Sequence, residues 1–240
     1  MSYKIPNLVH YTFKNNNLPA DIISNIEHNK HICPGFNFIF YDDNDIDKFI
    51  KNNFDETIYN AFKHINNKFG AMKADFFRYC VLYILGGVYI DIKSRINIPL
   101  KKIIRPNDIC LLDIPRTNLE SWRHSSPTYE QWLLIFAPKH PYLLTMINLM
   151  VYYINTRYEP KIKGIYRLTS KQRVLNVTGP DAFTRAINMY LIKNKLSYPL
   201  HRLINYNNYF SLIGVVNYKN MYTINKQKHY SEIGNESLYI

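Results

Sequence analysis

The residues from Ala71 to Lys93 constrain the fold of this chain more than any other stretch of its sequence. Residues 71–85 (AMKADFFRYCVLYIL) are mostly apolar and lack proline and glycine, so they predict a long helix packed in a core. Gly86 and Gly87 follow at once and predict the end of this helix, because glycine adopts the left-handed conformation of helix C-termini at little steric cost. Residues 88–93 (VYIDIK) then predict a strand, so that a helix, a tight turn and a strand form one unit.

This unit brings several polar side chains together. Asp75 and Arg78 are three residues apart and share one face of the helix. Tyr89, Asp91 and Lys93 alternate with apolar residues and share one face of the strand. Such a set suits a ligand with phosphates and hydroxyls, since arginine binds phosphate oxygens and carboxylates bind hydroxyls or metal. An ordinary helix ion pair and a turn-forming aspartate explain the same spacing, so the residues by themselves leave both interpretations open.

The rest of the chain alternates expected strands with expected helices. The strands are predicted at 8–13, 36–41, 109–114 and 132–137, and the helices at 19–29, 45–52, 55–65, 140–156 and 181–193. The residues before Gly179 are expected to be rich in loops. There is no internal repeat and no glycine- or serine-rich linker. The pattern predicts one α/β domain with a cleft at the carboxyl ends of its strands.

Composition limits the classes of protein that fit. No apolar run approaches the roughly 20 residues that span a bilayer, and the first residues lack the apolar core of a signal peptide. We therefore expect a soluble, cytoplasmic protein. The three cysteines have no metal-like spacing and are expected as buried thiols in a reducing compartment.

The formal net charge of +12 has two explanations. The chain is rich in Lys, Asn, Ile and Tyr, which fits the codon usage of an AT-rich microbial or viral genome. Its lysines are scattered and no nucleic-acid-binding motif is present, so we expect no nucleic-acid partner. An anionic ligand or contact with a membrane surface is the second explanation of the charge.

The central block is similar to the core of the DXD-containing glycosyltransferases of family 32 type. That family includes the yeast initiating mannosyltransferases and resembles the catalytic domains of the large clostridial glucosylating toxins. The block runs as Ala74-Asp75-Phe76-Phe77-Arg78-Tyr79 and then, from Leu82, as LYILGGVYIDIK. Weaker similarities lie at residues 5–10 (IPNLVH), 41–43 (YDD) and 178–180 (TGP). The resemblance implies a single GT-A-type (Rossmann-like) nucleotide-sugar-binding domain over residues 1–240, with a mixed central sheet.

By the same resemblance, the chain moves a sugar from a UDP- or GDP-sugar to a hydroxyl acceptor with retention of anomeric configuration. The nucleotide-sugar site lies within residues 5–115, and the acceptor side and a closing segment lie within 116–240. The catalytic residues carried over are Asp75, Arg78, Asp91 and Lys93. The donor-binding residues carried over are His10, Phe13, Asp42, Asp43, Asp75, Arg78, Tyr89, Asp91 and His229.

Lys93 departs from the family pattern, because it stands where the second acid of the Asp-x-Asp motif ligates Mn²⁺ or Mg²⁺. A charged lysine repels such a cation. Lys93 could itself replace the metal and bind the diphosphate. Asp91 could instead hold a metal together with His229 or Glu232, or the site could be inactive. The last case makes the chain a non-catalytic nucleotide-sugar- or glycan-binding module on the same fold.

Overall fold

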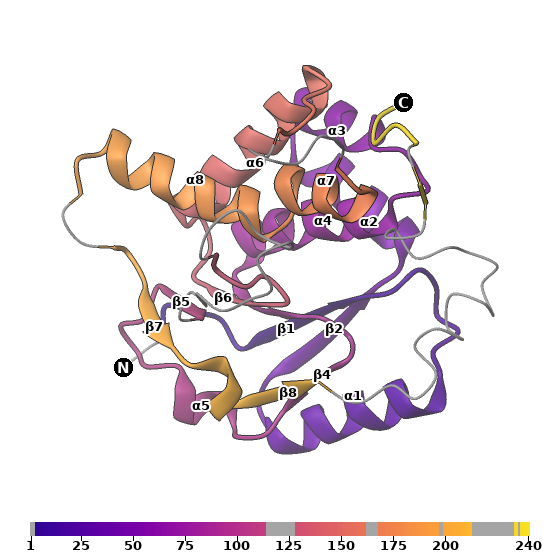
Figure 1. Cartoon of the computed structure of the whole chain (residues 1–240). Helices are drawn as coiled ribbons and strands as arrows, with labels where there is room; N and C mark the ends of the chain where they lie inside the picture. Colours follow the sequence, from indigo (N-terminus) through magenta and orange to yellow (C-terminus); the bar gives the residue numbers. More distant parts are fainter. Residues whose placement is uncertain (1–2, 114–127, 162–167, 197–198, 213–232, 235) are drawn as a thin grey trace.

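A six-stranded mixed sheet forms the frame of the protein (Figure 1). The computed structural model describes residues 3–113, 128–161, 168–196, 199–212, 233–234 and 236–240. The strands run in the order β2-β1-β3-β6-β5-β7; β6 is antiparallel to both of its neighbours, and the other pairs are parallel. The bounds are β1 (Leu8–Thr12), β2 (Asn37–Tyr41), β3 (Gly87–Ile90), β5 (Cys110–Asp113), β6 (Leu133–Phe136) and β7 (Arg202–Ile204). The expected mixed α/β sheet is confirmed.

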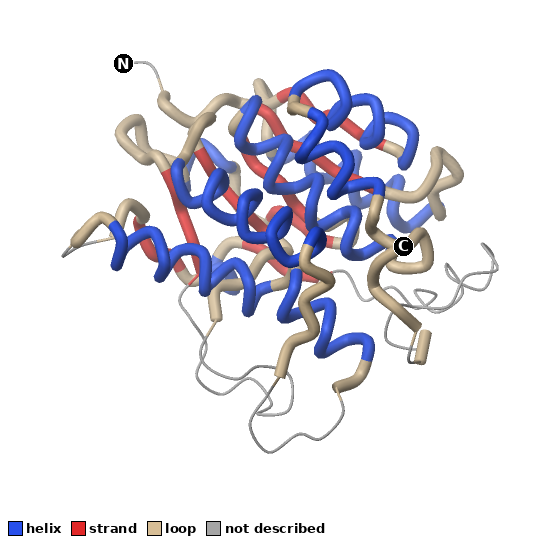
Figure 2. The backbone as a smooth tube through the Cα atoms, turned by 90° about the horizontal axis from the view of Figure 1, so that it is seen from above, coloured by secondary structure: helices blue, strands red, loops and turns tan. Residues whose placement is uncertain are grey.

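Helices cover both faces of this sheet (Figures 1 and 2). One face carries α2 (Asp43–Asn53), α3 (Glu56–Lys63), α4 (Gly70–Leu85), α6 (Pro141–Asn155), α7 (Ser170–Val177) and α8 (Pro180–Lys193). The other face carries α1 (Ala20–Ile32), α5 (Leu100–Ile103), the 3₁₀ turn η1 (Tyr206–Asn208) and a small sheet of β4 (Ser94–Ile96) and β8 (Phe210–Leu212). Among the described residues, none of the helices is both long and apolar enough to cross a bilayer.

The hydrophobic core is divided by the sheet. One cluster of buried side chains joins α2, α3, α4, α6, α7 and α8 to one face, and a second joins α1, α5 and the small sheet to the other. Tyr89 belongs to the first cluster, whereas Val88 and Ile90 belong to the second, which confirms the alternation expected in this strand. The three cysteines are buried free thiols, as predicted.

The helix, glycine turn and strand predicted in the central block are confirmed over most of their length. α4 ends at Leu85, and Gly86 and Gly87 have φ angles of 66° and 97°. The strand is shorter than predicted, because β3 stops at Ile90. Ser94 N donates to Asp91 O at 2.7 Å, which closes a turn over residues 91–94. Lys93 therefore lies in this turn rather than on the strand.

The region before Gly179 differs from its predicted loop structure, because it contains α7. Thr169 and Gln172 form a reciprocal capping box at the start of this helix. The pattern Thr-x-x-Gln was a usable signal, but the helix has only 8 residues and a short apolar pattern. The short elements β4, α5, β7 and β8 were also missed.

Gly87→Ala should lower the free energy of unfolding by at least about 2 kcal/mol. A Cβ atom at this position would lie 2.6 Å from Leu8 O, and the backbone conformation is one that alanine avoids. Urea denaturation measures the loss. Gly70→Ala is the matched control, because no atom lies within 4 Å of its added Cβ, and it should stay within about 1 kcal/mol of the wild type. Equal effects at the two glycines would contradict the role of the turn.

Candidate active site

A cavity of about 950 Å³ lies where the carboxyl ends of β1 and β3 face the first half of α4. This is the position expected for the cleft of an α/β sheet. Seven of the residues predicted for the site line this one cavity: Phe13, Asp43, Asp75, Arg78, Tyr89, Asp91 and Lys93. They come from four separate parts of the chain. The fold thus brings the main predicted residues together.

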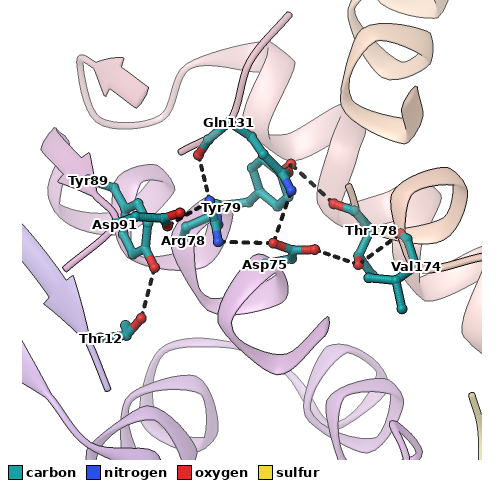
Figure 3. Close-up of polar contacts among 9 residues, drawn as sticks. All are labelled: Thr12, Asp75, Arg78, Tyr79, Tyr89, Asp91, Gln131, Val174 and Thr178. Carbon is teal, nitrogen blue, oxygen red and sulfur yellow. Dashed lines mark hydrogen bonds and ion pairs between the residues drawn. The ribbon is translucent and has the colours of Figure 1, made fainter. Parts of the chain in front are cut away.

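The Arg78 guanidinium is the centre of the site (Figure 3). Its Nη2 lies 3.0 Å from Asp75 Oδ1 and its Nη1 lies 3.4 Å from Asp91 Oδ1. Nη1 also donates to the backbone oxygen of Gln131 at 2.5 Å. The guanidinium carbon lies 4.6 Å from the centre of the Tyr89 ring, a cation–π distance. Burial lowers the pKa of Arg78, but Tyr89 and the two carboxylates outweigh it and hold this pKa above its ordinary value.

The two carboxylates beside Arg78 have different environments. The Asp75 side chain is 5% exposed, whereas the Asp91 side chain is 30% exposed and faces the cavity. Burial raises the pKa of Asp75 from 3.8 to about 6, although Arg78 and hydrogen bonds from Thr178 and Gln131 oppose the shift. Both carboxylates line the cavity, and Asp91 is the more accessible of the two.

Tyr89 completes the contact between the helix and the strands. Its hydroxyl lies 2.8 Å from Thr12 Oγ1, at the end of β1. Burial raises the pKa of Tyr89 to about 12, so this side chain is a neutral hydrogen-bonding group at physiological pH. The ring fixes the position of the Arg78 guanidinium at the cavity wall.

The cavity has an excess of positive charge. Seven lysines and Arg78 line it, against five carboxylates. The lysines are Lys14, Lys48, Lys63, Lys68, Lys73, Lys93 and Lys171. Lys63 lies 2.8 Å from Asp47, and Lys68 lies 2.6 Å from Glu236. The excess favours an anionic ligand such as a nucleotide diphosphate.

Two predicted donor contacts lie elsewhere in the structure. His10 is fully buried, with Nε2 2.9 Å from Gly86 O and Nδ1 3.2 Å from the Tyr41 hydroxyl. Burial lowers its pKa to about 4, so this imidazole is neutral and holds the glycine turn against β1. Asp42 caps α2 by accepting hydrogen bonds from the backbone nitrogens of residues 44 and 45. Neither residue lines the cavity, so we no longer place them among the donor contacts.

His229 and Glu232 lie outside the described residues, so the structure gives no account of them. Among the residues it does describe, no group of three or more His, Cys, Asp or Glu side chains is arranged to hold a metal ion. Asp91 already contacts Arg78, and the next motif position is the cationic Lys93. Of these two described motif positions, one offers a divalent cation a single carboxylate that already pairs with Arg78, and the other carries a positive charge.

Sequence patterns missed two residues that contact Asp75. Thr178 Oγ1 donates to Asp75 Oδ2 at 2.8 Å, and Gln131 Nε2 donates to Asp75 Oδ1 at 3.1 Å (Figure 3). Thr178 lies in the TGP stretch, where the sequence similarity gave its side chain no role. Gln131 lies two residues before β6 and carries no signal in the sequence.

The stability of the protein should depend on the charge of Asp75. Because the pKa of this carboxyl is higher in the folded state, folding takes up protons between about pH 4 and pH 6. The free energy of unfolding of the wild type, minus that of Asp75→Asn, should therefore fall by about 3 kcal/mol as the pH rises through this window. Urea denaturation at stepped pH measures the difference. A difference that is constant with pH would contradict a raised pKa.

Comparison with known proteins extends the interpretation of the central block. Residues 19–109 match the family described as the glycosyltransferase sugar-binding region containing the DXD motif. A mannosyl phosphorylinositol ceramide synthase of Saccharomyces cerevisiae is 26% identical over 157 residues, and an initiation-specific alpha-1,6-mannosyltransferase of Schizosaccharomyces pombe is 30% identical over 131 residues. These alignments cover 65% and 50% of this chain but 38% and 32% of the relatives. The chain thus spans about a third of the length of these proteins.

Solved structures share the fold. The PaToxG glycosyltransferase has a TM-score of 0.58 at 15% identity, over 78% of this chain and 70% of that one. The UDP-bound glycosyltransferase domain from the YGT toxin has a TM-score of 0.55 at 8% identity, over 83% of this chain and 79% of that one. At these identities the likeness shows the fold, which is the GT-A fold of such domains. The resemblance predicted from the central block is therefore confirmed: residues 19–109 are similar to the sugar-binding region of the DXD-motif glycosyltransferases, and the chain has the GT-A fold of such domains.

Proposed function

We propose that this protein transfers a sugar from a nucleotide-diphosphate sugar to a hydroxyl acceptor, with retention of anomeric configuration. The observation that carries the proposal is the convergence of Asp75, Arg78 and Asp91 on one cavity with an excess of positive charge. The UDP bound to the YGT toxin domain, which has the same fold, supports a nucleotide-sugar donor. The mannosyltransferase names among the relatives support sugar transfer as the reaction.

Different residues of the cavity would contact different parts of the donor. Asp91 faces the cavity and accepts hydrogen bonds from hydroxyls, and Arg78 supplies a permanent positive charge beside it. Phe13 lines the cavity at the end of β1 and offers an aromatic surface to the base. Asp43 lies at the start of α2, near the same end of the cavity wall.

Lys93 would stabilise the leaving diphosphate in place of a metal ion. Asp91, the one acid of the motif, is paired with Arg78, and the cationic Lys93 lines the cavity next to it. A fixed ammonium group stabilises negative charge that develops in a transition state, more strongly in a cavity than in bulk water. Retention by same-face attack requires this stabilisation together with precise positioning of the acceptor.

The whole of residues 1–240 would form one catalytic domain. Leu238 and Tyr239 pack in the same hydrophobic cluster as α4 and α6, which supports a single folding unit. The donor site would lie within residues 5–115, and the acceptor side would lie within 116–240. Gln131, Trp132 and Lys171 line the cavity from this second part of the chain.

Asp91→Ala should lower the rate of sugar transfer, or of donor hydrolysis, by at least about 10²-fold while the protein stays folded. Its carboxylate is partly exposed, and Arg78 keeps Asp75 as a buried partner when Asp91 is removed, so the variant should stay folded. Enzymatic assay of a panel of UDP- and GDP-sugars measures the rate, and circular dichroism checks the fold. Asp21→Ala, an exposed position on α1 outside the cavity, is the control. Full activity of the Asp91 variant would remove this residue from the mechanism.

Lys93→Met should also lower turnover by about 10²-fold, because it removes the charge that faces the diphosphate. In the wild type, turnover should survive exhaustive chelation with EDTA. Lys93→Asp restores the two-acid motif, and its turnover should depend on added Mn²⁺. Loss of wild-type activity on chelation, with rescue by Mn²⁺, would reject Lys93 as the substitute for a metal.

A second function is a nucleotide-sugar-binding module without catalysis. Lys93 at the position of the second acid is the observation that favours it. Calorimetry that shows donor binding, with neither hydrolysis nor transfer across an acceptor panel, would support this alternative.

A further inference from the structure

The Asp75 carboxylate has a nearly complete set of hydrogen-bond donors. A carboxylate offers about four acceptor places, two on each oxygen. Oδ1 accepts from Arg78 Nη2 at 3.0 Å and from Gln131 Nε2 at 3.1 Å. Oδ2 accepts from Thr178 Oγ1 at 2.8 Å. The described residues therefore leave one place, on Oδ2, and Asp75 lines the cavity.

The Tyr79 hydroxyl fixes the orientation of the Gln131 amide and also lies near the backbone of Thr178. It lies 2.5 Å from Gln131 Oε1 and 3.2 Å from the backbone oxygen of Thr178 (Figure 3). Because the Gln131 oxygen faces Tyr79, the amide nitrogen of the same side chain must face Asp75. Tyr79 is fully buried and comes from the helix that carries Asp75, so this arrangement is rigid.

Thr178 has a choice of acceptor, and its geometry favours Asp75. Its single hydroxyl proton can reach Asp75 Oδ2 at 2.8 Å or Val174 O at 3.4 Å. The shorter contact is to the charged acceptor, which forms the stronger hydrogen bond. Thr178 is fully buried at the end of α7, so water does not compete for this proton.

We propose that Tyr79, Gln131 and Thr178 are positioning residues: they hold the Asp75 carboxylate in its ionised form and leave a single acceptor place on it for one substrate hydroxyl. The network joins three segments, α4, the residues before β6, and the junction of α7 and α8. A role confined to packing would need neither the hydroxyl of Thr178 nor the amide of Gln131. The proposal of a substrate hydroxyl rests on the proposed sugar transfer, whereas the hydrogen-bonding role does not.

The direct test is an NMR titration of the Asp75 side-chain carboxyl, observed by ¹³C in the full chain. Thr178→Val, Gln131→Leu and Tyr79→Phe each remove one link. The pKa of Asp75 should rise by about one pH unit in Thr178→Val and in Gln131→Leu, because each loses a hydrogen bond to the charged form. Thr178→Ser keeps the hydroxyl and should restore the wild-type value. Thermal denaturation shows which variants stay folded.

Thr145→Val is the matched control for Thr178→Val. Its hydroxyl donates to Pro141 O at 2.9 Å on α6 and does not touch the network, so the pKa of Asp75 should not change. An Asp75 pKa that is the same in all folded variants as in the wild type would overturn the proposal. If one variant unfolds, the remaining two still report on their own links, and agreement of Thr178→Ser with the wild type still tests the hydroxyl.

The single acceptor place is tested with nucleotide sugars that lack one sugar hydroxyl at a time, measured by calorimetry. One deoxy donor should lose at least about tenfold in affinity with the wild type and show no further loss with Asp75→Asn. Two or more such hydroxyls would overturn the single-place assignment. If no nucleotide sugar binds while the pKa shifts appear, the proposed function fails and the positioning network stands. The reverse result, binding without pKa shifts, rejects the network alone.

Discussion

The site depends on one buried cation, the Arg78 guanidinium. Taking this charge out of water is costly, and Asp75, Asp91, a backbone oxygen and the Tyr89 ring together offset the cost. The compensation is unequal, because one carboxylate is buried and the other is partly open to the cavity. The buried partner fixes the guanidinium in place. The open partner can exchange part of its contact for a ligand without leaving the arginine unpaired.

The glycine turn and two side-chain contacts from β1 hold α4, and with it this cation, in place. Gly86 and Gly87 let α4 turn directly into β3, which pairs with β1. His10 of β1 then contacts Gly86 O, and Thr12 at the end of the same strand contacts Tyr89. His10, which was predicted to contact the donor, thus has a structural role, and burial keeps its imidazole neutral. The groups that line the cavity take their positions from this buried backbone geometry.

Local patterns were sufficient to predict that the polar residues close in sequence lie together. Helix and strand periodicity and one glycine pair group Asp75, Arg78, Tyr89 and Asp91, whereas the family resemblance is what assigns them to a donor site. Gln131 and Thr178 lie 56 and 103 residues from Asp75, and no periodicity links such distant positions. The lysines show the same limit, because residues scattered along the sequence gather around one cavity. Spacing in the chain predicts elements, whereas the tertiary fold decides which polar groups meet.

Under the proposed function, the positive charge of the cavity accounts for a lysine at position 93. In a site with two acids, the motif attracts a divalent cation, and the cation then neutralises the diphosphate. Replacing the second acid with lysine changes the local charge by two units and removes a ligand at the same time. The cavity already holds eight cationic side chains against five carboxylates, so the protein itself can counter the diphosphate. A lysine in this setting therefore agrees with the charge of the whole cavity, because the same anionic ligand would meet positive charge from several parts of the chain.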